Sequence, residues 1–239
     1  MGLEGRYQVE ALLQARFWKN SAWQQSLPVR AGRCMGGVMK EKLLPKVKAL
    51  YEAVLELIGE DVDIRDVKVS DITGRAGIGK GTAYEYFSNK EELISSALLY
   101  HIDLISSQMM ESLRKKEGLV SRVCLILECM DREISKRDCL IQFIQLLTDN
   151  GPIGKALHKG LREKNEEICT PQDVIGLLIQ DGIRQGEIKG QLPDFYMRMV
   201  VISKLLVYAI YIMEDEAAKL GDKGQMHRML CEGLLKELG

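Results

Sequence analysis

The stretch that decides the fold runs from Val69 to Leu93 and reads VSDITGRAGIGKGTAYEYFSNKEEL. Ile72 and Ala76 stand four residues apart, the spacing that places two side chains on one face of a helix. Gly77 follows them, at the position where a residue in the left-handed conformation commonly ends a helix. The pattern predicts a short helix that stops at Gly77 and leads into a tight turn.

A second short helix follows the turn. Ala83 and Phe87 repeat the four-residue spacing and are expected to pack against the first helix, which makes a helix-turn-helix. At about 100° per residue, Gly81, Tyr84 and Glu85 lie opposite this seam, with Lys80 on the flank at the start of the helix. Such a face can enter a DNA major groove, where Lys80 would donate to guanine and Tyr84 would pack on a thymine methyl group or a sugar. Thr82 and Tyr86 are placed to reach phosphates.

A third helix begins directly after this unit. Asn89 as N-cap, with Glu92 three residues later, forms a capping-box pattern. The unpaired N–H groups of that helix start, together with Lys90, could hold a phosphate; the plainer interpretation is that the cap only starts a helix and that Lys90 is solvated.

The stretch 47–93 resembles the DNA-binding domain of the TetR (tetracycline-repressor) family of bacterial transcriptional regulators. The residues that match the family pattern are Val69, Asp71, Ile72, Ala76, Gly77, Gly81, Thr82, Tyr84, Tyr86, Phe87, Lys90, Glu91, Glu92 and Leu93. The resemblance implies that Ser70, Lys80, Gly81 and Tyr84 face bases and that Thr82, Tyr86 and Lys90 hold phosphates. It further implies a cytoplasmic homodimeric repressor that a small-molecule inducer releases from a palindromic double-stranded DNA operator.

Three positions depart from the family pattern. Gly79 replaces the usual Ser or Thr that caps the recognition helix, and Lys68 replaces a usual Thr before the preceding helix. Glu85 puts an acidic group where aromatic or basic residues are frequent, so the operator sequence does not transfer. Glu85 and the acidic remainder of the chain leave an alternative open, namely an all-α interaction protein that keeps the helix-turn-helix without binding DNA.

Helical periodicity covers most of the remaining chain. The first helix is expected to follow Lys42, with Pro45 in its first turn. The stretch 62–67, in which apolar and charged residues alternate, is too short to pair as a strand and is expected to be a loop. Further helices are expected at 90–116, 119–136, 138–149, 153–168, 171–187, 195–219 and 224–238. The predicted fold is all-α, with a helix-turn-helix domain over 40–93 and a larger helical domain for ligand binding and dimerisation over 94–239.

Charge is unevenly distributed along the 239 residues. The net charge is −1, but residues 1–48 hold nine Lys and Arg against three Asp and Glu, which leaves the rest of the chain at −7. Residues 1–39 are interpreted as a basic extension without helical or strand periodicity. It is either an arm that touches DNA or the product of an upstream start codon, since Met35 and Met39 precede the first helix.

The last two helices carry more apolar residues than one packed face requires, and some of these residues, Leu234 among them, are expected to meet a second subunit. Soft and aromatic side chains suggest an apolar ligand pocket. The candidates are Tyr100, Met109, Met130, Phe143, Tyr208 and Tyr211. Ordinary core packing is the alternative for each of them.

The remaining side chains point to no further chemistry. The six cysteines form no CxxC pair and the three histidines are interpreted as lone residues on the surface or in the core, so no disulfide, metal or cofactor is expected. The glycines at 77, 79 and 81 follow a helix and not a strand, which excludes a dinucleotide loop; no enzyme activity is expected. No apolar run approaches the ~18 residues of a membrane span, so no membrane partner is expected.

Overall fold

The computed structural model describes residues 43–60, 62–134, 146, 150–163, 168–213 and 222–239, and every regular element in these ranges is a helix. The elements are α2 (Pro45–Gly59), α3 (Val69–Arg75), α4 (Lys80–Tyr86), α5 (Lys90–Arg114), α6 (Leu119–Ile134), α8 (Pro152–Glu163), α9 (Pro171–Arg184), α10 (Asp194–Met213) and α11 (Lys223–Leu238). The predicted fold class is therefore confirmed.

Helix α2 begins as the sequence predicts. Pro45 is its first residue, where the missing N–H group costs no intrahelical hydrogen bond. Its inner face is fully buried at Leu50, Val54 and Ile58, and packs against α3 and α5. The stretch 62–67 is a loop, as expected, and its residues Ile64 and Val67, at 1% and 3% exposure, belong to the first core.

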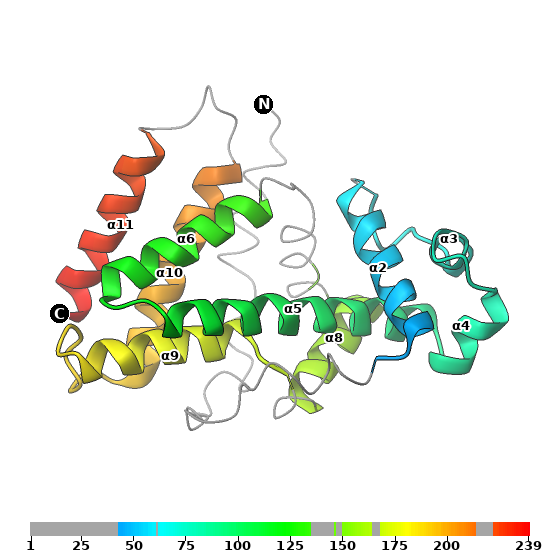
Figure 1. Cartoon of the computed structure of the whole chain (residues 1–239), viewed down its shortest axis with the longest axis horizontal. Helices are drawn as coiled ribbons and strands as arrows, with labels where there is room; N and C mark the ends of the chain where they lie inside the picture. The colour runs from blue at the N-terminus through cyan, green and yellow to red at the C-terminus, as the bar shows by residue number, and fades with distance from the viewer. Residues whose placement is uncertain (1–42, 61, 135–145, 147–149, 164–167, 214–221) are drawn as a thin grey trace.

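Helix α5 joins the two ends of the molecule (Figure 1). Its 25 residues span about 37 Å at 1.5 Å per residue. Leu93, Leu98 and Ile102 belong to a first core shared with α2, α3, α4 and α8. Met109 and Leu113, farther along, belong to a second core shared with α6, α9, α10 and α11. One continuous helix thus crosses the predicted domain boundary at residue 93.

Helix α8 packs tightly against the first half of α5. A Cβ atom added to Gly160 would overlap the end of the Leu99 side chain, so a larger residue at this position would require Leu99 to move. The first core therefore extends past the three N-terminal helices, and α8 is anchored to the helix that follows the helix-turn-helix.

The far end of the molecule is braced by polar contacts. Arg122 on α6 and Asp181 on α9 form a buried ion pair at 3.1 Å, and the Arg122 side chain also donates to the carbonyl of Lys116. The Glu187 carboxylate accepts the N–H of Leu119 at 2.8 Å and so caps the start of α6 from a turn 68 residues away. These contacts fix α6 to α9.

Helix α10 corrects one expectation. Asp194–Ile212 is long and apolar enough to cross a membrane by length and composition, although the sequence analysis expected no such run. Its residues Val201 and Tyr208 are buried in the second core, between α6, α9 and α11. One such helix does not by itself indicate a membrane span, because an apolar helix packed in a helical bundle passes the same test.

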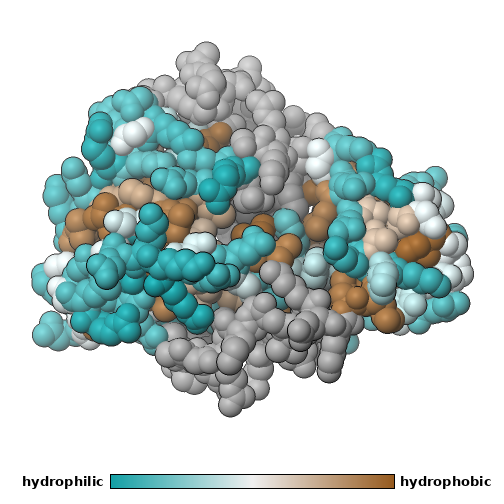
Figure 2. All heavy atoms as spheres, in the orientation of Figure 1, coloured by the Kyte–Doolittle hydropathy of each residue, from teal (hydrophilic) through white to brown (hydrophobic). Residues whose placement is uncertain are grey.

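Two sequence predictions fall outside the described residues. The extension 1–39 is one of them, and the helix at 138–149 is the other, apart from Leu146, which is helical and buried. On the face drawn in Figure 2, hydrophilic side chains cover much of the described surface, and hydrophobic patches appear both near α6 and α11 and at the opposite end around α2 to α4.

Candidate nucleic-acid interface

The turn between α3 and α4 is a Schellman motif. Gly77 has φ 65°, the left-handed conformation that the sequence predicts for it. The N–H of Ile78 donates to the carbonyl of Thr73 at 3.0 Å, and the N–H of Gly77 donates to that of Gly74 at 3.3 Å. Because these bonds satisfy the last carbonyls of α3, the direction in which α4 leaves the turn is fixed.

The seam between the two helices is also as predicted. Ile72 is fully buried, and Ala83 and Phe87 are 2% and 7% exposed in the same core. Ala76 is partly buried and packs against that core. Burial of one side of α4 determines which side remains in water.

The outward side of α4 carries the residues predicted to read bases. Lys80, Gly81 and Glu85 are exposed, and Tyr84 has 49% of its surface in water although it is a large aromatic residue. No atom lies within 4 Å of a Cβ built on Gly81, so nothing in the protein requires a glycine there. These features suit a surface that meets a partner closely.

The flanking candidates Ser70, Thr82 and Tyr86 lie on α3 and α4. Ser70 is exposed on α3, where its hydroxyl lies 3.4 Å from the Asp71 carboxylate. Thr82 and Tyr86 are half-buried on α4, and the Tyr86 ring packs partly against the first core. Gly79 caps α4 without a side-chain hydrogen bond, as its missing side chain predicts.

The start of α5 follows the predicted capping pattern with one difference. The Asn89 side chain accepts the N–H of Glu92 at 2.8 Å. The Glu92 carboxylate accepts the N–H of Ser88 at 2.7 Å, one residue before the N–H that a standard capping box uses. The start of α5 is thus held directly beside the end of the recognition helix.

Lys90 has a partner that the sequence analysis did not foresee. Its ammonium group donates to the carbonyl of Arg65 at 2.7 Å and so ties the 62–67 loop to the start of α5. The Arg65 guanidinium donates hydrogen bonds to both carboxylate oxygens of Asp63, the shortest at 2.6 Å, and these hydrogen bonds lower the pKa of Asp63. A sequence pattern gives no signal for these contacts, because they cross a turn of irregular backbone.

A second ion pair joins the ends of α2 and α3. The Arg75 guanidinium donates to both carboxylate oxygens of Glu60, at 2.6 and 2.8 Å, and thereby lowers the pKa of Glu60. Both side chains are exposed, so the pair orients the helices more than it stabilises the fold.

The predicted pocket residues divide between the two cores. Tyr100 lies in the first core, where its ring centroid is 5.4 Å from that of Tyr51. The other candidates within the described residues belong to the second core: Met109, Met130, Tyr208 and Tyr211. Phe143 lies outside the described residues. Tyr100 is therefore not brought together with the pair Tyr208 and Tyr211, whose rings stack at 6.0 Å.

The hydroxyl group of Tyr208 belongs to a polar network. It donates to Asp131 at 2.6 Å and lies 2.6 Å from Nε2 of His227, while Lys223 pairs with the same carboxylate at 2.7 Å. Burial, followed by the contact with Asp131, raises the pKa of Tyr208. Within the described residues, no group of three His, Cys, Asp or Glu side chains is arranged to hold a metal ion.

Comparisons with known proteins agree with this geometry. Residues 50–97 match the family described as bacterial regulatory proteins, tetR family. Over 180 aligned residues the chain is 25% identical to the fatty acid metabolism regulator protein of Bacillus subtilis (strain 168). The aligned residues cover 74% of this chain and 89% of the relative.

Solved structures share the fold. FadR from Bacillus subtilis in complex with stearoyl-CoA matches with a TM-score of 0.61 and 20% identity, over 80% of this chain and 99% of that one. FadR from Bacillus halodurans matches with the same TM-score and 19% identity, over 82% of this chain and 97% of that one. The arrangement of a helix-turn-helix before a larger helical body is therefore shared along nearly their whole length.

Gly81→Ala tests whether the backbone of α4 approaches DNA. The new methyl group meets no protein atom, so the melting temperature should stay unchanged or rise slightly, because alanine favours helix. Affinity for an operator selected from a random DNA pool should fall about tenfold, the scale of one lost base contact. Gly59→Ala, which is equally free of contacts at the end of α2, is the matched control. Equal operator affinities in the two variants would contradict the orientation of α4.

Tyr84→Ala and Lys90→Ala separate base reading from phosphate binding. Tyr84→Ala should weaken operator binding by about 1–3 kcal/mol with little effect on random DNA. Lys90→Ala should weaken binding to all sequences and lower the salt slope by about one. Lys115→Ala, at the opposite end of α5, should change neither quantity. A Lys90→Ala variant with an unchanged salt slope and a lower melting temperature would limit Lys90 to holding the Arg65 carbonyl.

Proposed function

This chain belongs to the TetR family of bacterial transcriptional regulators, and from this premise we propose that it is a homodimeric repressor that a small-molecule inducer releases from a palindromic operator. The observation that carries the proposal is the exposed face of α4. Its buried seam, at Ala83 and Phe87, leaves Lys80, Gly81 and Tyr84 directed at solvent. We propose that Lys80 and Tyr84, with Ser70, read bases, that Gly81 lets the backbone of α4 come close to the bases, and that Thr82, Tyr86 and Lys90 hold phosphates.

The alternative of a helix-turn-helix without DNA binding is not favoured. It rested on Glu85 and on the acidic remainder of the chain. Glu85 is exposed at the far end of a seven-residue helix whose first residue is Lys80, so the basic group leads into the groove. The excess of acidic residues lies in residues 49–239, whereas residues 1–48 hold nine Lys and Arg against three Asp and Glu. We further propose that the protein acts in the cytoplasm, without a cofactor and without enzyme activity.

The proposed dimer interface is formed by α10 and α11. Large apolar side chains remain in water on both helices, with Val207 at 51% and Met229 at 61% exposure. Leu234, which the sequence analysis expected at the interface, is 1% exposed and belongs to the second core. A second copy of the chain would cover the exposed residues and supply the second half-site that specific binding requires.

Long-chain acyl-CoA is the inducer class that we propose. The curated relative is named a regulator of fatty acid metabolism, and a structure with the same fold holds stearoyl-CoA. The second core offers Met109, Met130 and Tyr211, soft and aromatic side chains of the kind that line adaptable apolar sites. An acyl-CoA bound within the second core would act on DNA binding through α5, the helix that both cores share.

The dimer predicts a specific effect of charge on α10 and α11. Val207→Glu combined with Met229→Glu should convert a particle of twice 27.0 kDa into one of 27.0 kDa in light scattering, because two buried carboxylates would face their copies. Val120→Glu, at an exposed apolar position on α6, should leave the dimer intact. A double variant that stays dimeric with an unchanged helical circular-dichroism spectrum would place the interface elsewhere.

Operator release tests the inducer class. Saturating stearoyl-CoA should weaken operator affinity by about 5–150-fold, the usual range of coupling between two sites. Stearate and CoA, added separately, supply each half of the molecule and should have little effect. If the protein binds its selected operator and stearoyl-CoA leaves that binding unchanged, the proposal of acyl-CoA as the inducer class is wrong. If the protein binds no DNA at all, the proposal that it is a DNA-binding repressor is wrong.

A further inference from the structure

The seam between α6 and α11 collects chemically active side chains. Lys223, His227 and Cys231 recur every four residues along α11 and therefore share one face. Asp131 and Cys124, two turns apart on α6, meet that face from the other side. The polar end is the network around Asp131 described above, and the other end is a pair of thiols.

The two thiols are in contact although 107 residues separate them in the sequence. Sγ of Cys124 lies 3.8 Å from Sγ of Cys231. Cys231 is 5% exposed, and Cys124 is half-buried, so one sulfur of the pair is nearer to solvent. A disulfide bond requires about 2.05 Å between the sulfurs, so less than 2 Å of approach has to be shared by two side chains.

We propose that Cys124 and Cys231 are a redox modification site, at which a hydroperoxide converts the two thiols into a reversible disulfide that ties α11 to α6. The seam holds both sulfurs in place before any oxidant arrives, which favours this pairing over others. The proposal depends on the thiol pair and not on the operator or on acyl-CoA.

The chemistry balances with hydrogen peroxide as the oxidant. The thiolate of Cys124, the more accessible sulfur, attacks one peroxide oxygen; the O–O bond breaks, and Cys124 becomes a sulfenic acid as the released hydroxide takes up a proton. The thiolate of Cys231 then attacks the Cys124 sulfur, the S–O bond breaks, and hydroxide again leaves as water. Two thiols and one peroxide yield one disulfide and two waters, and the two sulfurs lose the two electrons that the peroxide gains.

The environment of the pair sets the pH dependence of this reaction. Burial, with a smaller contribution from the neighbouring Cys124 thiol, raises the pKa of Cys231 to about 12. The second step needs the Cys231 thiolate, whose fraction grows with pH below that value. Formation of the disulfide should therefore become faster as pH rises from 7 to 9.

Peptide mapping of the full-length protein tests the proposal. After treatment with hydrogen peroxide, the chain should lose two hydrogen atoms in mass and yield one new peptide that links residues 124 and 231, and dithiothreitol should reverse both changes. The melting temperature should rise by about 5–10 °C, because the bridge restricts a long loop of the unfolded chain. This mapping uses the unaltered protein, so it does not depend on the folding of a variant.

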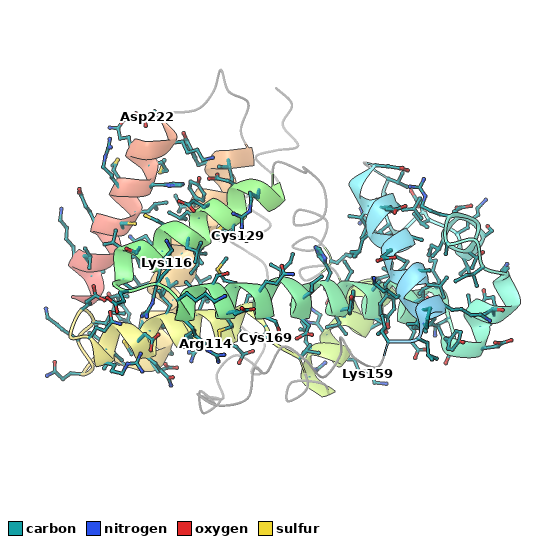
Figure 3. The ribbon with its side chains drawn as sticks, in the orientation of Figure 1. Arg114, Lys116, Cys129, Lys159, Cys169 and Asp222 are labelled. Carbon is teal, nitrogen blue, oxygen red and sulfur yellow. The ribbon has the colours of Figure 1, made fainter. Side chains whose placement is uncertain are left out.

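Cysteine variants supply the controls. Cys124→Ser and Cys231→Ser should each abolish the linked peptide. Cys129→Ser on α6 and Cys169→Ser beside α5, both labelled in Figure 3, should leave it unchanged. A linkage of Cys124 or Cys231 to any other cysteine, irreversible oxidation of Cys124 without a linkage, or no reaction under peroxide would each overturn the proposal.

Discussion

The packing of α5 against both cores is the constraint on which the rest of the structure depends. Leu93 and Leu98 bury its first half in the core where it packs against α2 and α8, and Leu113 buries its last turn among the helices of the second core. Because both halves of α5 are packed in a core, a shift in the second core would move the helix that leads into the helix-turn-helix. The capped start of α5, at Asn89, lies directly beside the recognition helix.

The two ends of α5 are held differently. At the far end, the buried pair of Arg122 and Asp181 and the carboxylate of Glu187 at the start of α6 form a polar brace. At the DNA-binding end, the contacts outside the core are exposed, such as those of Arg75 with Glu60 and of Lys90 with the Arg65 carbonyl. Exposed ion pairs contribute little stability, so the packing of the first core carries most of the stability of this end.

The second core combines packing with polar groups that have specific partners. Tyr208 is fully buried, yet its hydroxyl is satisfied by Asp131 and His227, so the network fixes how α6, α10 and α11 meet. The thiols of Cys124 and Cys231 lie along the same seam. Residues that looked like pocket or core positions in the sequence therefore also hold the last two helices in register.

The sequence by itself determined the local structure around Gly77. Glycine at a helix end, the Ala83 and Phe87 spacing and the Asn89 cap are short-range signals, so the helix-turn-helix and the orientation of α4 were predictable. The tertiary structure alone decided which apolar residues face inward where helices have more than one apolar face: Leu234 became core while Met229 stayed in water. The partners of Lys90 and Cys231 were equally hidden, because contacts between residues far apart in the chain depend on how helices pack and leave no periodic signal in the sequence.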